Sequence, residues 1–168
     1  LPVKVVNNFV QINGPVGTVS YGIFANSGSY HEFLHNTVRI GSANPSAYAL
    51  YVSSGQFHKA LNNILSNNGG GGALAMNGSA NWVESDYNDL YTTGPILLNN
   101  LSSGQTFPNL LAWQNAGNIT EEHSLSENPL FVANNDYRIA QSALNGAGKP
   151  VSVTTDIEGQ PRDPLHPD

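Results

Sequence analysis

Four charged residues recur along the first half of the chain at nearly constant spacing and with alternating sign: Lys4, Glu32, Lys59 and Glu84. If a fold placed them side by side, Lys59 between two carboxylates and next to His58 could in principle act as a general base. Flanking carboxylates, however, hold a lysine in its charged form, which opposes that role. Opposite charges in register instead attract by about 0–1 kcal/mol for each exposed pair. We therefore predict a salt-bridge ladder and keep a catalytic site as the alternative, with these candidates: Lys59, Glu84, Glu32 and His58.

Aromatic and imidazole side chains at matched spacing could bind a ligand. Tyr30 and Phe57 are 27 positions apart, and so are His31 and His58. Aromatic rings offer a large apolar face that suits a sugar ring, although we expect half or more of the aromatic residues of this chain to face the core. The candidate binding residues are Tyr30, Phe57, His31 and Trp82.

The segment SDYNDL, residues 85–90, contains candidate oxygen ligands for a metal. Asp86 and Asp89, with Asn88 between them, offer the carboxylate and amide oxygens that Ca²⁺ prefers. The segment lacks the spacing of an EF-hand, and a turn explains it equally well. No other cofactor is indicated, so Ca²⁺ at Asp86 and Asp89 is the single metal hypothesis.

The composition excludes two classes of protein and indicates a chain that turns often. The net charge is −6, with three lysines and three arginines, so no basic face for nucleic acid can be assembled. No apolar run approaches the ~20 residues of a membrane span. Charged residues make up 11% of the chain, against about 25% in a typical domain. The polarity comes instead from 22 Asn, 16 Ser and 17 Gly, which are residues of turns.

An internal repeat accounts for this composition. When Tyr21–Asn36 is compared with the segment 27 positions later, Tyr48–Asn63, six of sixteen residues are identical. A leucine-rich repeat would need a fixed frame of leucines that the chain lacks. Segments such as NFVQING and NTVRIGS alternate apolar and polar residues as strands do, with Val10, Ile12, Val38 and Ile40 predicted to face inward. The repeat therefore predicts an all-β, right-handed parallel β-helix of about four coils between Val3 and Leu98.

Stacked coils would place matched residues about 4.8 Å apart. Asn8, Asn36, Asn63 and Asn88 share one column, which predicts an asparagine ladder at a corner, with side-chain amides bonded from coil to coil. An apolar column is predicted at Ile23, Leu50, Leu74 and Ile96, with spacing that shrinks from 27 to 24 to 22.

The four glycines Gly69–Gly72 form either a linker or a corner of the coil. Apolar columns continue on both sides of them, which favours a corner between a strand that ends near Leu65 and a strand that starts near Ala73. Gly41–Tyr48 would fill the same corner one coil earlier. Glycine suits such a corner because it accepts positive φ.

A short helix is predicted after the coils, within SGQTFPNLLAWQNAGN. Ser103 or Thr106 would lie near its start, Pro108 in its first turn, and Gly117 at its end. Its apolar residues are predicted to cover the end of the core: Leu110, Leu111 and Trp113. A solenoid needs such a cap because its last coil otherwise exposes core and strand edges.

The last third of the chain resembles a known family. SENPLF (126–131), DYRI (136–139), SALNGAG (142–148) and TDIEGQPRD (155–163) are similar to the closing segment of secreted bacterial right-handed parallel β-helix proteins of the pectate-lyase-like, polysaccharide-lyase-like superfamily. The resemblance spans residues 105–168 and implies an extracellular or cell-surface location. Lyases of this family neutralise a uronate carboxylate, often with Ca²⁺, and abstract a proton with lysine or arginine. The matching motifs lie in the closing region, so no catalytic residue is carried over.

These observations divide the chain into β-helix coils at residues 1–104 and a capping helix, last coil and tail at residues 105–168. We expect a segment of a longer extracellular protein that binds glycans or builds a surface assembly, with a polysaccharide or cell-surface partner. The alternatives are a polysaccharide lyase or glycoside hydrolase acting in the groove of the β-helix, and a self-assembling adhesive protein. The first coil carries no cap in the sequence, which predicts an end-to-end contact there with upstream sequence or another subunit.

Overall fold

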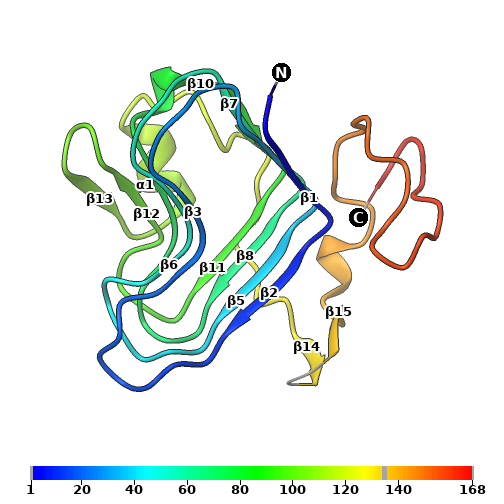
Figure 1. Cartoon of the computed structure of the whole chain (residues 1–168), viewed down its shortest axis with the longest axis horizontal. Coiled ribbons are helices and arrows are strands. Elements are labelled where there is room, and N and C mark those ends of the chain that lie inside the picture. The colour runs from blue at the N-terminus through cyan, green and yellow to red at the C-terminus, as the bar shows by residue number, and fades with distance from the viewer. Residues whose placement is uncertain (1, 134–135, 168) are drawn as a thin grey trace.

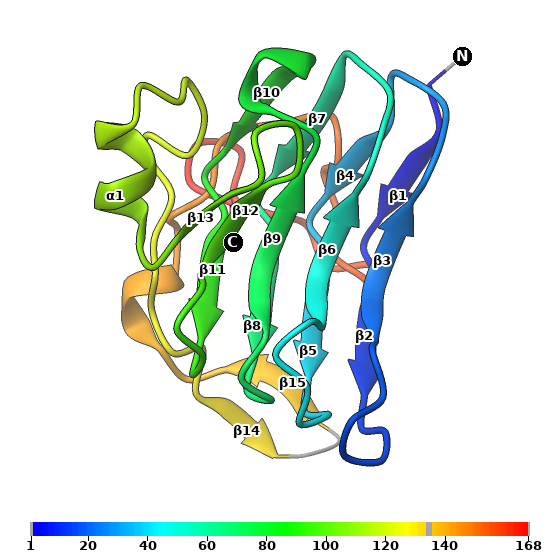
Figure 2. The ribbon, with the colours of Figure 1, turned by 90° about the vertical axis from the view of Figure 1, so that its left-hand side faces the viewer.

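The computed structural model describes residues 2–133 and 136–167. In it, each of four successive coils contributes one short strand to each of three sheets, and the strands from successive coils pair in parallel. Sheet A contains β1 (Lys4–Val6), β4 (Glu32–Leu34), β7 (His58–Leu61) and β10 (Trp82–Asp86). Sheet B contains β2 (Phe9–Ile12), β5 (Thr37–Ile40), β8 (Ile64–Asn67) and β11 (Asp89–Thr92). Sheet C contains β3 (Tyr21–Ala25), β6 (Tyr48–Val52), β9 (Gly72–Met76) and β12 (Leu98–Asn100), and β13 (Gln105–Phe107) is added to β12 in the antiparallel direction. The predicted all-β parallel β-helix is confirmed (Figures 1 and 2).

The core lies between the three sheets and is built from the predicted alternation. Val38 and Ile40 of β5 are fully buried, and Val10 and Ile12 of β2 pack against the same cluster. The predicted apolar column of sheet C is wrong in the fourth coil, where Leu98, not Ile96, pairs with Leu74. The chain turns between β11 and β12, and the turn takes up Ile96, so the spacing stays at 24 residues instead of shrinking to 22.

The glycine run forms the predicted corner between β8 and β9. The corner stacks on the corresponding turn of the coil before, since the Asn44 N–H donates to the Gly69 carbonyl at 3.1 Å. Only Gly70 of the run has positive φ, at 87°. Gly69 and Gly71 are required for a different reason, because a Cβ there would lie 1.8 Å from the Ser42 carbonyl oxygen and 2.1 Å from that of Ala47. Close stacking of the corners therefore explains Gly69 and Gly71, and positive φ explains Gly70. The Tyr48 ring, 2.3 Å from where a Cβ would lie, explains Gly72.

The asparagine ladder is confirmed at the corner between sheets A and B. The Asn8 amide donates to Asn36 Oδ1 at 2.8 Å, and the pattern repeats from Asn36 to Asn63 and from Asn63 to Asn88, each at 2.9 Å. Each Oδ1 also accepts the backbone N–H of the asparagine one coil earlier, at 3.0–3.2 Å. The ladder therefore bonds all four coils to one another through buried side chains.

Two residues end this ladder. Ser124 Oγ accepts the Asn88 backbone N–H at 2.9 Å, and Glu121 Oε2 accepts the Asn88 side-chain amide at 3.1 Å. Together they accept the backbone and side-chain N–H groups that a single asparagine Oδ1 accepts elsewhere in the ladder. Glu121 is fully buried and also accepts from the hydroxyls of Ser85 and Ser124. Burial raises the pKa of the Glu121 carboxyl, and the three donors oppose that shift.

The helix predicted after the coils is present but begins later than predicted. Residues Gln105–Phe107 form β13, which pairs antiparallel with β12, so neither Ser103 nor Thr106 starts the helix. Helix α1 (Leu110–Asn115) begins after Asn109, whose side chain accepts the Ala112 N–H, and a left-handed Gly117 follows its end.

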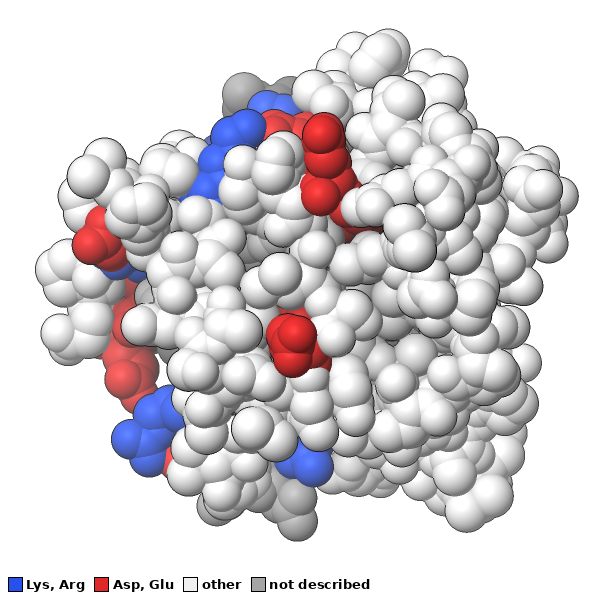
Figure 3. All heavy atoms as spheres, turned by 180° about the vertical axis from the view of Figure 1, so that it is seen from behind, with Lys and Arg blue, Asp and Glu red and all other residues white. Residues whose placement is uncertain are grey.

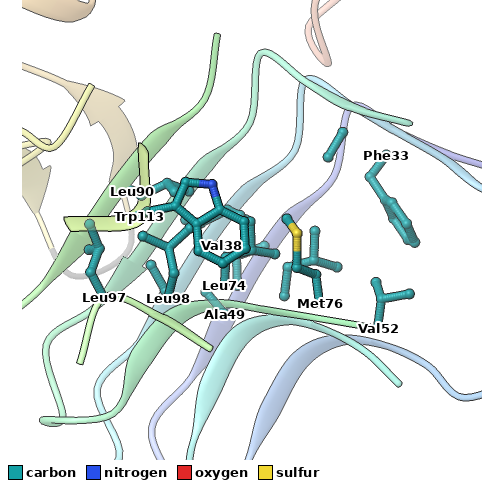
Figure 4. Packing of buried hydrophobic residues seen from close by; sticks show 14 of the residues in the cluster. Phe33, Val38, Ala49, Val52, Leu74, Met76, Leu90, Leu97, Leu98 and Trp113 are labelled. Atoms are coloured by element: carbon teal, nitrogen blue, oxygen red, sulfur yellow. The ribbon is translucent and has the colours of Figure 1, made fainter. Parts of the chain in front are cut away.

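Helix α1 covers the core with one face. Trp113 is fully buried and lies edge-on to Phe107 at 5.0 Å between ring centroids. Figure 4 shows its indole beside Leu90, Leu97 and Leu98 at the end of the core. The prediction for Leu111 is wrong, because its side chain is 65% exposed on the outer face of the helix.

The last segment returns along the outside of the coils to the corner between sheets A and B (Figure 1). It contains an antiparallel pair, β14 (Phe131–Ala133) and β15 (Asp136–Ile139), and a short 3₁₀ turn, η2 (Ser142–Leu144); another, η1 (Ser79–Asn81), precedes β10. Asn7 and Asn62 fasten it, because the Asn7 amide donates to the Thr155 carbonyl at 2.8 Å and Asn62 exchanges two hydrogen bonds with the Lys149 backbone.

Two features of the described residues bear on the partners that the sequence predicts. None of the helices they form has the length and apolar character needed to cross a membrane. Strands β1, β2 and β3 each have a neighbour on one side within the described residues. The contact expected at this edge, with upstream sequence or another subunit, stays a prediction.

Candidate functional site

The charged column lies on sheet A in the predicted register. Lys4 pairs with Glu32, Glu32 with Lys59, and Lys59 with Glu84 as neighbours in successive strands. The ion pairs differ from a simple ladder, since Lys4 contacts Glu32 at 3.2 Å and Glu84 contacts Lys149 of the tail at 2.5 Å. Both carboxylates beside Lys59 thus have a lysine partner from elsewhere, which opposes their use as general acids or bases.

The other sequence candidates on sheet A differ sharply in exposure. His58 is fully buried, accepts the His31 backbone N–H at 3.3 Å through Nδ1, and contacts the Ser54 carbonyl through Nε2. Burial lowers the pKa of His58, which favours the neutral ring, and both ring nitrogens already have partners. His31 stacks on it at 5.0 Å between centroids. Trp82 is buried as well, with its indole N–H donated to Asn77.

Tyr30 and Phe57 remain at the surface. Their rings are 57% and 47% exposed and stack at 5.0 Å with an angle of 22° between the planes. Both residues have left-handed backbone, with φ of 63° and 61°. The rings line a hollow on the outer face of sheet A together with Pro2, Glu32, Lys59 and Val83. We call this surface the sheet A platform.

The proposed calcium ligands enter separate hydrogen-bond networks. Asp86 accepts the His123 backbone N–H and contacts His123 Nδ1 at 2.7 Å, which raises the pKa of that imidazole. Asn88 belongs to the asparagine ladder, and Asp89 accepts the Glu127 N–H at 2.8 Å. Among the described residues, no three acidic, imidazole or thiol side chains lie close enough together to hold a metal ion.

A cavity of about 410 Å³ lies between sheet B and the returning tail. Its floor is one register column on the outer face of the sheet, formed by the first residue of each strand: Phe9, Thr37, Ile64 and Asp89. Each of these residues directly follows a ladder asparagine, so the ladder sets their spacing and direction. We call this space the tail cavity.

A second column forms one side of the tail cavity and the tail forms its roof. Asn7, His35, Asn62 and Tyr87 precede the ladder asparagines and all have left-handed φ, between 52° and 59°. The tail contributes apolar and aromatic side chains above the floor: Tyr137, Ile139, Leu144 and Ile157. Phe9 of the floor contacts Tyr137 at 5.2 Å between ring centroids, which joins floor and roof.

Asp89 is the unusual group of the tail cavity. The residue is 4% exposed, and its Oδ2 atom has no hydrogen-bond partner among the described residues. Burial is the main cause that raises the pKa of its carboxyl to about 7, while the hydrogen bond from the Glu127 N–H opposes the shift. A carboxyl in this state can present either a donor or an acceptor at neutral pH.

We predict that Asp89→Asn flattens the dependence of stability on pH. The pKa of Asp89 is about 7 in the folded protein, against an ordinary value of 3.8 for an aspartate exposed to water. The stability that Asp89 contributes is therefore fully present below about pH 4 and is lost as the pH rises to about 7. The loss in the free energy of unfolding is up to about 4 kcal/mol, at 1.36 kcal/mol per pKa unit. The amide stays neutral, so the variant should gain stability over the wild type by that amount at pH 8 and match it near pH 4. Urea denaturation between pH 4 and 8 measures both curves, and parallel curves would contradict the pKa.

Figure 3 shows that charged side chains are sparse on the face turned away in Figure 1, so neutral groups dominate the surface there. No protein-family model, curated protein or solved structure matches the chain. The functional assignment therefore rests on the residues and their geometry.

Sequence reasoning missed the tail cavity, although one signal for its floor was present. The motif around Asp89 suggests only a metal ligand, whereas the place of this residue directly after a ladder asparagine puts it in the column of Phe9, Thr37 and Ile64. The roof had no comparable signal, because the tail does not follow the period of the coils.

Proposed function

We propose that the protein is an extracellular β-helix module that binds polysaccharide on the sheet A platform. One observation carries this proposal: Tyr30 and Phe57, two large aromatic residues in left-handed backbone, form a stacked pair whose rings are about half exposed. Left-handed backbone in a bulky residue costs about 1–3 kcal/mol and concentrates at functional sites. The resemblance of residues 105–168 to secreted β-helix proteins supports the extracellular location.

The neighbours of the aromatic pair suit a sugar ligand. An exposed aromatic face packs against the apolar C–H face of a sugar ring, and Lys59 and Glu32 at the same hollow offer hydrogen bonds to hydroxyl or carboxylate groups. The register between β7 and β10 shifts at Val83, which also lines the hollow. Such irregularities redirect side chains next to binding sites.

We expect the double variant Tyr30→Ala/Phe57→Ala to bind polysaccharide about 5- to 150-fold more weakly than the wild type, since each aromatic contact contributes about 0.5–1.5 kcal/mol. Isothermal titration with pectin, alginate and glycosaminoglycan chains measures the affinities. Phe24→Ala is the matched control, because Phe24 is 53% exposed and contacts two aromatic rings on sheet C.

The possible outcomes test the location of the binding site and the binding function separately. Equal affinity of the double variant and the wild type would place the ligand elsewhere, and no binding to any of the chains would overturn the function. Assays for reducing ends and unsaturated products run alongside test the enzymatic alternative. Turnover that disappears in Lys59→Ala would replace the binding proposal with a lyase or hydrolase.

A further inference from the structure

The tail cavity has three features of a site that binds a small molecule: its volume, its partly apolar lining and a buried polar atom without a partner among the described residues. Its volume of about 410 Å³ falls within the ~300–1,000 Å³ of ligand pockets. Half of its floor and much of its roof are apolar or aromatic, and one nearly fully buried polar atom, Asp89 Oδ2, lacks a partner among the described residues. Buried polar atoms are almost always hydrogen-bonded, so we expect a ligand or a water molecule to donate to this atom.

The charges of the tail cavity favour a neutral ligand. Four basic side chains in its lining have partners, which leaves them poorly suited to hold an anion: Arg138 pairs with Asp136, His123 pairs with Asp86, Arg162 donates to Asn7 Oδ1, and His35 contacts the Asn62 amide. Of the two carboxylates in the roof, Asp156 accepts the backbone N–H groups of Glu158 and Gln160. The other, Glu158, acts on Arg138, whose pKa is raised by the hydrogen bond to Asp136 and, to a smaller extent, by the charge of Glu158. The remaining polar groups of the floor are the Asp89 carboxyl and the Thr37 hydroxyl.

A hydroxyl group is the natural partner for Asp89. Its Oδ2 atom is nearly fully buried and has no partner among the described residues, and a hydroxyl can donate a hydrogen bond to it. The rings of Phe9 and Tyr137 beside Ile64 offer an apolar surface for the other face of the ligand. A sugar unit has this combination of hydroxyl edges and an apolar face.

We propose that the tail cavity is a second carbohydrate site, which binds one neutral sugar unit with Asp89 as its polar anchor and Phe9 and Tyr137 as its apolar partners. This proposal shares a ligand class with the sheet A platform but uses other residues. The two sites can therefore fail independently.

Titration with glucose, galactose, mannose, xylose and N-acetylglucosamine, followed by methyl NMR of the isoleucine and leucine residues, tests the proposal. We expect at least one of these sugars to shift the methyl signals of Ile64, Ile139 and Leu144 at millimolar concentration. Ile64→Trp fills the floor and should abolish the shifts. Asp89→Ala removes the anchor and should weaken binding about tenfold, whereas Asp89→Asn keeps a polar anchor and should stay within about threefold of the wild type.

Two controls keep the result interpretable. Tyr30→Ala/Phe57→Ala should leave these shifts unchanged, because it alters only the sheet A platform. Circular dichroism establishes that each variant is folded. Absence of shifts with every sugar, or shifts that persist in both Ile64→Trp and Asp89→Ala, would overturn the proposal. If glucosamine and putrescine shift these signals while the neutral sugars do not, the site binds cations and the assignment to a neutral sugar is wrong.

Discussion

Replacement of Asn63 by alanine is expected to lower the free energy of unfolding by about 4 kcal/mol, since each buried polar group left unpaired costs about 1–3 kcal/mol. Asn63 is buried in the middle of the ladder and makes four side-chain hydrogen bonds there. Its Oδ1 accepts the backbone and side-chain N–H groups of Asn36, and its amide donates to Asn88 Oδ1 and to the Phe33 carbonyl. Alanine removes all four, so buried groups in the two neighbouring coils lose these partners. Urea denaturation measures the loss.

Asn8→Ala is the matched control, because the same substitution falls at the end of the same ladder. Asn8 is only half-buried, and its amide donates to Asn36 Oδ1 and to the Val6 carbonyl. We expect a loss of about 1 kcal/mol, in line with partly exposed hydrogen bonds. Similar losses for Asn8→Ala and Asn63→Ala would show that burial does not increase the stability contributed by the hydrogen bonds of the ladder.

Trp113→Ala is expected to cost about 3–5 kcal/mol, as do other replacements of a buried tryptophan by alanine. The indole covers the end of the core, and its N–H donates to the backbone and hydroxyl of Thr120 at 3.1 and 3.2 Å. Its loss leaves a cavity beside Phe107 and frees the segment that carries Glu121, the end of the asparagine ladder. Thermal and urea denaturation should both show the decrease.

Leu111→Ala provides the control on the same helix. Its side chain points to solvent, so the change should lie within about 0.5 kcal/mol of the wild type. A large loss for Leu111→Ala, or a small loss for Trp113→Ala, would mean that α1 does not cap the core in the orientation described.

The coils could be predicted from the sequence because their contacts repeat. Residues 24 to 28 positions apart become neighbours in adjacent strands, as Lys4, Glu32, Lys59 and Glu84 do, so one alignment of the chain with itself supplies the register. The same alignment located the asparagine ladder. It failed where a turn changed length, at Ile96, because the apolar character of a turn residue mimics that of a strand residue.

The sites were less predictable. The sequence brought Tyr30 and Phe57 together but could not say that their rings stay exposed while His58 and Trp82, in or next to the same columns, are buried. Exposure depends on which side of each strand faces the core and on what later segments cover. The cap of the ladder by Glu121 and Ser124 was also missed, since neither residue is an asparagine at the repeat spacing.

The stacking of the coils, most of the residues that face the core and the asparagine ladder could be predicted from the sequence alone, because they depend on periodic contacts between similar residues. The position of the tail, and with it the tail cavity and the environment of Asp89, became known from the folded structure. The tail is held by aperiodic contacts across 87 to 155 residues, between Asn62 and Lys149 and between Asn7 and Arg162. Such contacts follow from shape and hydrogen bonding in the assembled fold, and they leave no repeating pattern in the chain.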